Sequence, residues 1–125
     1  PTILGSWRVV SIEATDGLGS PLVPPGSATI EFAASESGPG RITGDGGVNR
    51  FGGPFEFSLG ERNVGVLKIR DLAATRRAGP EDAMRFEEAL LAALQESRTV
   101  TISGVDAVID TGRDRVRLTK TNGNR

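Results

Sequence analysis

The sequence predicts one α+β domain, a strongly curved, mostly antiparallel sheet or partial barrel of about eight short strands with one long helix packed on it. Two observations lead to this fold class. Short segments that alternate apolar and polar residues recur along the chain, and a single segment, residues 80–97, has helical periodicity instead. The strands are joined by short connections, which indicates antiparallel pairing. A helix that covers one face or opening of the sheet would bury the apolar surfaces of both.

The length and composition favour a folded domain with a core of its own. The chain has 125 residues, which fits a single domain over residues 1–125 with a core of about 4–120. A chain of this size buries roughly two-thirds of the surface that it exposes when unfolded. With 37% apolar and 25% charged residues, overall disorder is not expected.

The first half of the chain is predicted to contain only strands and turns. The loop at Asp16–Gly26 has three Gly and three Pro residues, and Glu36–Gly40 is a turn cluster. A tight glycine turn with a bulge is expected at Gly44–Gly47 and again near Gly52-Gly53. The predicted strands are Trp7–Ile12, Ala28–Phe32, Arg41–Thr43, Phe55–Leu59 and Val64–Ile69.

Residues Pro80–Ser97 are predicted to form the helix. Pro80 suits the first helical position, and Glu81 and Asp82 place negative charge at the positive end of the helix dipole. Glu87 falls within the apolar arc, where we expect it to lie at the edge and reach solvent. The residues of the apolar face are Ala83, Phe86, Leu90, Ala93 and Leu94.

Three further strands are predicted after the helix, followed by a frayed tail at Asn122–Arg125. Asp110-Thr111-Gly112 imitates the signature of an aspartic protease, in which a strand delivers a carboxylate to a pair. Only 13 residues follow Gly112, so a hairpin turn is the favoured interpretation. The strands are Thr99–Ser103, Ala107–Asp110 and Arg115–Thr119.

The residues that are missing argue against catalysis. The chain has no Cys, His or Tyr, so it lacks thiol nucleophiles, zinc thiolate sites and the commonest general base. No Gly-Lys-Ser or Gly-Lys-Thr follows the glycines at Gly44–Gly47, so a phosphate loop is not expected. Asp45 and Asn49 offer too few oxygens for a calcium loop. We therefore predict no enzyme, no catalytic residue, no metal site and no cofactor.

Charge and hydropathy say little about partners. The net charge of −1 gives no general attraction to nucleic acid, and no apolar run reaches the ~18 residues of a transmembrane segment. A monomer is expected, whereas the partner, a protein or a small molecule, stays unknown. The location also stays open between the cytoplasm and export with the signal segment absent from this sequence.

Gly5-Ser6-Trp7 matches the short Gly-x-Trp element of calycin barrels such as lipocalins. A Trp at the base of a barrel, packed on a neighbouring Arg, is by default a structural plug. This match leaves open a second function, a barrel that holds an apolar small molecule. Such a binder needs an open interior cavity, whereas a closed module has that space filled by Phe32, Phe55, Phe57 and helix residues.

Residues Gly44–Gly53 resemble the Gly-Cys-Asn-x-Phe-x-Gly signature of the META (HslJ-like) domain family. Ala73–Gly79 is similar to the Ala-Thr-Arg-Met-Ala-Cys segment of that family, and the opening Gly5-x-Trp7 strand, the helix and the final hairpin follow in the family's order. The resemblance extends from about Leu4 to Lys120. It implies a small α+β domain without an established catalytic activity, associated with heat shock, envelope stress and, in some bacteria, drug tolerance.

The resemblance also implies roles for single residues. Val48 and Gly79 stand where the family usually has paired cysteines, so these two positions are expected to be close in space. Asn49 is expected to adopt a left-handed backbone or to cap nearby N–H groups, and Thr75 to hydrogen-bond the glycine turn. The motif residues, all expected to be structural, are Gly5, Trp7, Gly44, Gly47, Asn49, Phe51, Gly53 and Thr75.

Overall fold

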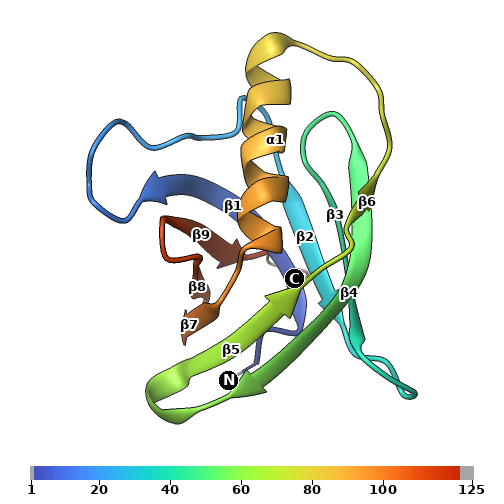
Figure 1. Cartoon of the computed structure of the whole chain (residues 1–125), viewed down its shortest axis with the longest axis vertical. Coiled ribbons are helices and arrows are strands. Elements are labelled where there is room, and N and C mark those ends of the chain that lie inside the picture. The colour runs from blue at the N-terminus through green and yellow to red at the C-terminus, as the bar shows by residue number, and fades with distance from the viewer. Residues whose placement is uncertain (1, 122–125) are drawn as a thin grey trace.

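The computed structural model describes residues 2–121, which form a closed antiparallel barrel of eight strands with one helix and one short strand outside the ring (Figure 1). The ring runs β3-β2-β1-β9-β8-β7-β5-β4 and closes where β4 pairs with β3. The fold class predicted from the sequence is correct. The elements are β1 (Gly5–Ala14), β2 (Thr29–Ala33), β3 (Gly40–Asp45), β4 (Arg50–Leu59), β5 (Val64–Ile69), β6 (Ala73–Ala74), α1 (Glu81–Gln95), β7 (Thr99–Ser103), β8 (Asp106–Asp110) and β9 (Asp114–Lys120), with a short 3₁₀ turn at Glu61–Asn63.

Strand β4 is twice as long as the sequence predicts, because it begins at Arg50 inside the glycine-rich motif. Its residues 50–55 pair with β3, and its residues 55–59 pair with β5. Gly52 and Gly53, expected in a turn or bulge, are therefore ladder residues. The short strand β6, which the sequence did not predict, pairs with Phe51 and Gly52 of β4 beyond the end of β5.

The helix begins at Glu81 and ends at Gln95, so it is shorter than the predicted Pro80–Ser97. Pro80 has an extended backbone, with φ −55° and ψ 146°, and precedes the helix instead of occupying its first position. Figure 1 shows α1 lying beside the barrel, with its C-terminal end directed toward β7. Among residues 2–121, no helix combines the length and the apolar character needed to cross a lipid bilayer.

The core fills the barrel and continues under α1. Trp7 is fully buried and donates its indole N–H to the Ile3 carbonyl at 2.8 Å. The cation packed on the Trp7 ring is Lys120, with Nζ 4.9 Å from the ring centroid. The Arg expected from the sequence is not in this position. Phe32 and Phe55 meet edge to face at 5.0 Å, whereas Phe57 is only half-buried. The helix contributes Phe86, Leu90, Ala93 and Leu94 to the same core.

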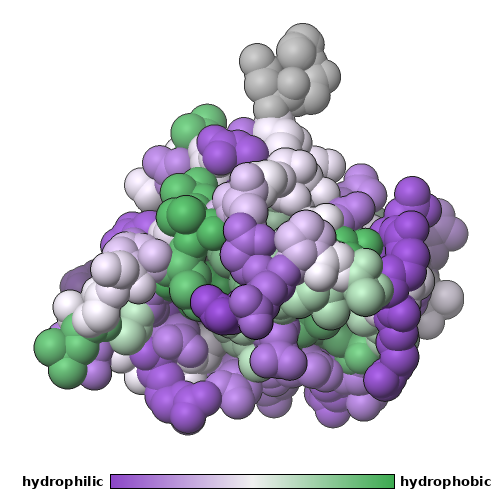
Figure 2. Space-filling model, turned by 90° about the horizontal axis from the view of Figure 1, so that it is seen from above, coloured by the Kyte–Doolittle hydropathy of each residue, from purple (hydrophilic) through white to green (hydrophobic). Residues whose placement is uncertain are grey.

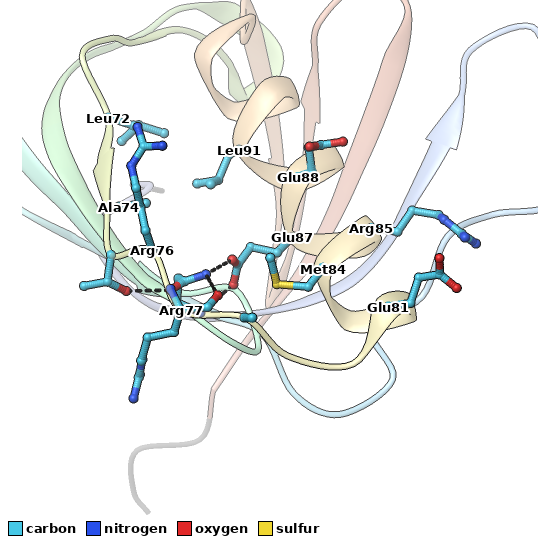
Figure 3. Close-up of a pocket in the computed structure, with 13 residues that line it drawn as sticks. Leu72, Ala74, Arg76, Arg77, Glu81, Met84, Arg85, Glu87, Glu88 and Leu91 are labelled. Carbon is cyan, nitrogen blue, oxygen red and sulfur yellow. Dashed lines mark hydrogen bonds between the residues drawn. The ribbon is translucent and has the colours of Figure 1, made fainter.

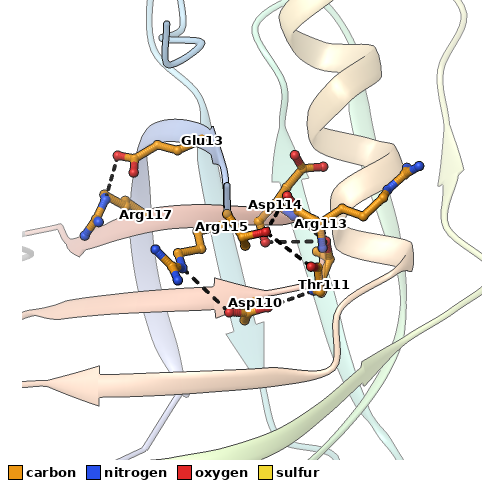
Figure 4. Close-up of polar contacts among 9 residues, drawn as sticks. Glu13, Asp110, Thr111, Arg113, Asp114, Arg115 and Arg117 are labelled. Carbon is orange, nitrogen blue, oxygen red and sulfur yellow. Dashed lines mark hydrogen bonds and ion pairs between the residues drawn. The ribbon is translucent and has the colours of Figure 1, made fainter. Parts of the chain in front are cut away.

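The Asp110-Thr111-Gly112 segment is a hairpin turn between β8 and β9, as the sequence predicts (Figure 4). The Asp110 carboxylate accepts a hydrogen bond from the N–H of Gly112 at 2.7 Å, and Thr111 N–H donates to the Asp114 carbonyl at 3.0 Å. The φ of Gly112, 96°, lies in the left-handed region that the turn requires. The predicted tail at Asn122–Arg125 lies outside the described residues.

Candidate functional site

Glu87 is the buried carboxylate of α1, and its side chain points at the turn between β3 and β4. It is only 4% exposed, so the expectation that it reaches solvent is wrong. Its Oε1 accepts hydrogen bonds from the N–H groups of Val48 at 3.0 Å and Asn49 at 2.6 Å. Its Oε2 accepts from Nδ2 of Asn49 at 2.6 Å. These three bonds offset the cost of removing a carboxylate from water.

The glycine turn makes room for this carboxylate. A Cβ at Gly46 would lie 2.6 Å from Cγ of Glu87, so a side chain there would displace the glutamate. Gly47 has a φ of 114°, and its N–H donates to Oδ1 of the Asp45 carboxylate at 2.8 Å. The sequence signal that could have located Glu87 is therefore the glycine pair, since a turn without Cβ atoms can point its N–H groups at a helix side chain.

Asn49 connects the turn, the helix and the segment after β6. Its Nδ2 donates to Glu87 and, at 3.1 Å, to the Arg77 carbonyl. Its Oδ1 accepts from Thr75 Oγ1 at 2.9 Å and from the Arg77 N–H at 2.6 Å. The side-chain amide thus makes the four hydrogen bonds of which it is capable. Asn49 caps nearby backbone groups and has no left-handed backbone, while Thr75 also accepts the N–H of Arg50 at 3.1 Å.

Val48 and Gly79 lie against each other. An ideal Cβ at Gly79 would be 3.5 Å from Cβ of Val48, at the short end of the roughly 3.5–4.5 Å found between the Cβ atoms of a disulfide. It would also lie 2.8 Å from Cγ2 of Val48, so the glycine leaves space for the valine side chain. The two positions thus join the β3–β4 turn to the chain that enters α1.

The other motif residues have packing roles in the same part of the barrel. The ring of Phe51 lies where a Cβ of Gly44 would be, and the segment at Asp71-Leu72 passes 3.1 Å from the Cβ position of Gly53. Gly5 has a φ of 121° at the start of β1. The motif therefore shapes the turn, the barrel end and the crossing of the chain toward β6.

A groove of about 770 Å³ lies between β6 with the segment that follows it on one side and α1 on the other (Figure 3). Leu72 and Leu91 project into it from the two sides. Leu72 N–H also donates to Oε1 of Gln95 at 3.3 Å, which bridges strand and helix at one end. The lining residues are Asn49, Leu72, Ala74–Ala78, Glu81, Met84, Arg85, Glu87, Glu88 and Leu91.

The charges of the groove are only partly matched by the protein. The guanidinium of Arg77 donates a hydrogen bond to the Val48 carbonyl at 3.3 Å. Arg76 is exposed and has no carboxylate within ion-pair distance among residues 2–121. Its side chain runs along the strand past Ala74 toward Leu72 (Figure 3). The end of the molecule at which α1 begins has small apolar areas set among polar atoms (Figure 2).

A second polar cluster lies on β1, β8 and β9, where it stabilises the barrel surface (Figure 4). Arg117 Nε donates to Glu13 Oε2 at 2.7 Å, and this hydrogen bond holds the pKa of Glu13 below its ordinary value. Within the described part of the chain, no three His, Cys, Asp or Glu side chains are grouped closely enough to hold a metal ion.

Comparisons with known proteins agree with this fold. The chain is similar to an NMR structure of a protein from Burkholderia xenovorans, with 20% sequence identity, a TM-score of 0.71, and 94% of this chain and 82% of that chain covered. At that identity the likeness shows the fold alone. No curated protein matches the chain. The META domain family matches residues 2–123, nearly the whole sequence. The chain therefore belongs to the META domain family.

Proposed function

We propose that this META domain is a non-catalytic binding module and that it binds its partner in the groove between β6 and α1. The observation that carries the proposal is the groove itself. Its volume of about 770 Å³ lies within the roughly 300–1,000 Å³ of typical ligand sites, and apolar side chains face one another across it. The family's association with stress and the bacterial envelope extends to this chain only as part of the same proposal.

The chemistry of the groove supports binding without catalysis. Its buried carboxylate, Glu87, accepts hydrogen bonds from three N–H groups of the protein, so its lone pairs are directed at the protein itself. The side-chain amide of Asn49 likewise makes all four of its hydrogen bonds to other groups of the protein. With no His, Cys or Tyr in the chain, a proton-transfer or nucleophilic role would fall to exposed carboxylates and hydroxyls.

The alternative, an apolar small molecule inside the barrel, has less support. The interior positions carry large, fully buried side chains, including Trp7, Phe32 and Phe86, which occupy the space that such a ligand needs. The groove outside the ring is open, so the proposal places the ligand there.

The test is amide-resolved NMR with a library of small apolar and amphipathic fragments. We expect the shifts to gather on residues 72–78 and 84–91. Leu91→Arg, which fills the groove with a charge, should abolish them. Val66→Arg is the matched control, because Val66 is 49% exposed on β5 and does not line the groove. Shifts that gather on core residues such as Trp7 would overturn the proposal, as would the absence of shifts at residues 72–78 with fragments and short peptides alike.

A further inference from the structure

The outer edge of β6 has backbone groups that the barrel does not use. Thr75 N–H donates to the Arg50 carbonyl at 3.0 Å, so Thr75 faces β4. In an antiparallel ladder the backbone groups of successive residues point to opposite sides. Ala73 therefore faces β4 as well, whereas the N–H and C=O of Leu72 and Ala74 face the groove. The hydrogen bond from Leu72 N–H to the Gln95 side chain across the groove agrees with this alternation.

Ala74 consequently presents a donor and an acceptor to the groove. Both residues of β6 are exposed, and the pairing with β4 places the Ala74 N–H on the side of β6 away from that strand. An extended peptide backbone offers N–H and C=O groups at the same spacing, whereas a compact apolar ligand leaves both unmatched. The walls fit the same occupant, since an added strand would place alternate side chains between Leu72 and Leu91.

The charge of the groove indicates that the peptide carries an acidic side chain. Arg76 lies along the strand edge without a carboxylate partner in the described chain, and Figure 3 shows Glu88 and Arg85 turned away from it. An acidic side chain on the added strand would supply the missing partner, in the planar geometry that guanidinium and carboxylate share.

We propose that the groove binds an extended peptide segment of another protein, which adds as a strand to the edge of β6 and pairs an acidic side chain with Arg76. This inference rests on the proposed function, because it names the ligand of the same groove. The competing interpretation is that the shortness of β6 and the charge of Arg76 only protect an exposed edge from aggregation.

The first experiment measures binding of the blocked peptide Ac-Thr-Val-Glu-Val-Thr-NH₂ by NMR titration. Replacing its Glu by Gln should weaken binding roughly threefold to tenfold. Arg76→Gln should produce the same loss and remove the difference between the two peptides. Arg8→Gln is the control, since Arg8 is exposed on β1 and does not line the groove, and it should leave both affinities unchanged.

The second experiment tests strand addition itself. N-methylation of successive peptide residues should abolish binding at alternate positions only, since alternate N–H groups would face β6. Ala74→Pro removes the N–H that faces the groove while sparing the bonds of Ala73 and Thr75 to β4, and it should weaken binding roughly threefold to tenfold. Ala74→Val keeps the N–H and is the matched control. The methylation series uses the unaltered protein and so decides the matter even if Ala74→Pro fails to fold.

The outcomes separate the two proposals. Fragment shifts in the groove without alternate dependence on N-methylation would overturn strand addition and leave the groove as a binding site. Binding that is indifferent to the charge of the peptide would overturn the role of Arg76. If neither fragments nor peptides perturb residues 72–78, both proposals fail and edge protection remains as the explanation of β6.

Discussion

At the scale of single residues, Glu87 holds α1 to the β3–β4 turn. In Glu87→Gln, the amide oxygen can still accept the backbone N–H groups of Val48 and Asn49, but the amide nitrogen then faces Nδ2 of Asn49, another donor. We expect the free energy of unfolding to fall by about 1–3 kcal/mol, measured by urea denaturation. Glu88→Gln is the control, because Glu88 is exposed. Equal stability of the two variants would contradict the role assigned to Glu87.

Glu13 gives a prediction about pH. The hydrogen bond from Arg117 lowers the pKa of Glu13 in the folded protein, so the ionised pair contributes to stability above the ordinary glutamate pKa. That contribution should disappear as the pH falls below about 4.3 and passes through the lowered folded-state pKa. Carboxyl carbon NMR should show a higher pKa for Glu13 in Arg117→Gln than in the unaltered protein. An unchanged pKa would mean that the pair does not persist in solution.

At the scale of elements, Phe86 is the main apolar anchor of α1. It is 2% exposed and lies in the core shared by the helix and the barrel. Phe86→Ala removes this aromatic packing and should lower the free energy of unfolding by about 3–5 kcal/mol, measured in denaturant. Arg85→Ala, one position earlier and exposed, should change it little. A loss below about 1 kcal/mol for Phe86→Ala would contradict the packing of the helix.

The contact between Val48 and Gly79 links the β3–β4 turn to the entry of α1, and a covalent bond can test it. In the double variant Val48→Cys with Gly79→Cys, the smaller thiol at 48 relieves the contact that any Cβ at 79 makes with valine. The φ of Gly79 is outside the left-handed region, so a cysteine there is unstrained. We expect spontaneous oxidation and a gain of about 2–4 kcal/mol in the loop-entropy description.

The reduced form of the same double variant is the matched control for this disulfide. Thermal unfolding with and without reductant should show the higher midpoint for the oxidised protein. Failure of the two thiols to join under mild oxidation would mean that the two segments are farther apart in solution than the side-chain contact indicates.

At the scale of the whole molecule, most of the barrel could be predicted from local patterns. The bounds of Val64–Ile69 and Thr99–Ser103 are correct, since the first segment alternates in part and the second throughout. Glycines and a proline hide the alternation of Arg50–Pro54, so the sequence does not predict a strand there, and β6 has only two residues. The family motif located Asn49 and Thr75, yet the burial of Glu87 depends on a turn far away in sequence. The groove depends on β6 and was therefore not predictable.

The ring places the first strand beside the last. β1 pairs with β9 over residues such as Ala14 and Asp114, which are far apart in sequence, and β1 has β2 as its other neighbour. During synthesis, β1 leaves the ribosome before the other strands. Its edge toward β9 stays unpaired until almost all of the domain has been made. Because pairing across a long loop carries a large entropic cost, this closure is expected to limit the rate of folding.

A circular permutant would move that closure to another pair of strands. Opening the chain in the turn after β8 and joining the original ends with a flexible linker makes β9 and β1 a local pair, and it makes β9 and β8 the first and last strands of the ring. Because one long-range pairing remains, stopped-flow refolding should keep a similar rate. Much faster refolding would show that the pairing of β1 with β9, and not closure of the ring as such, is the slow step.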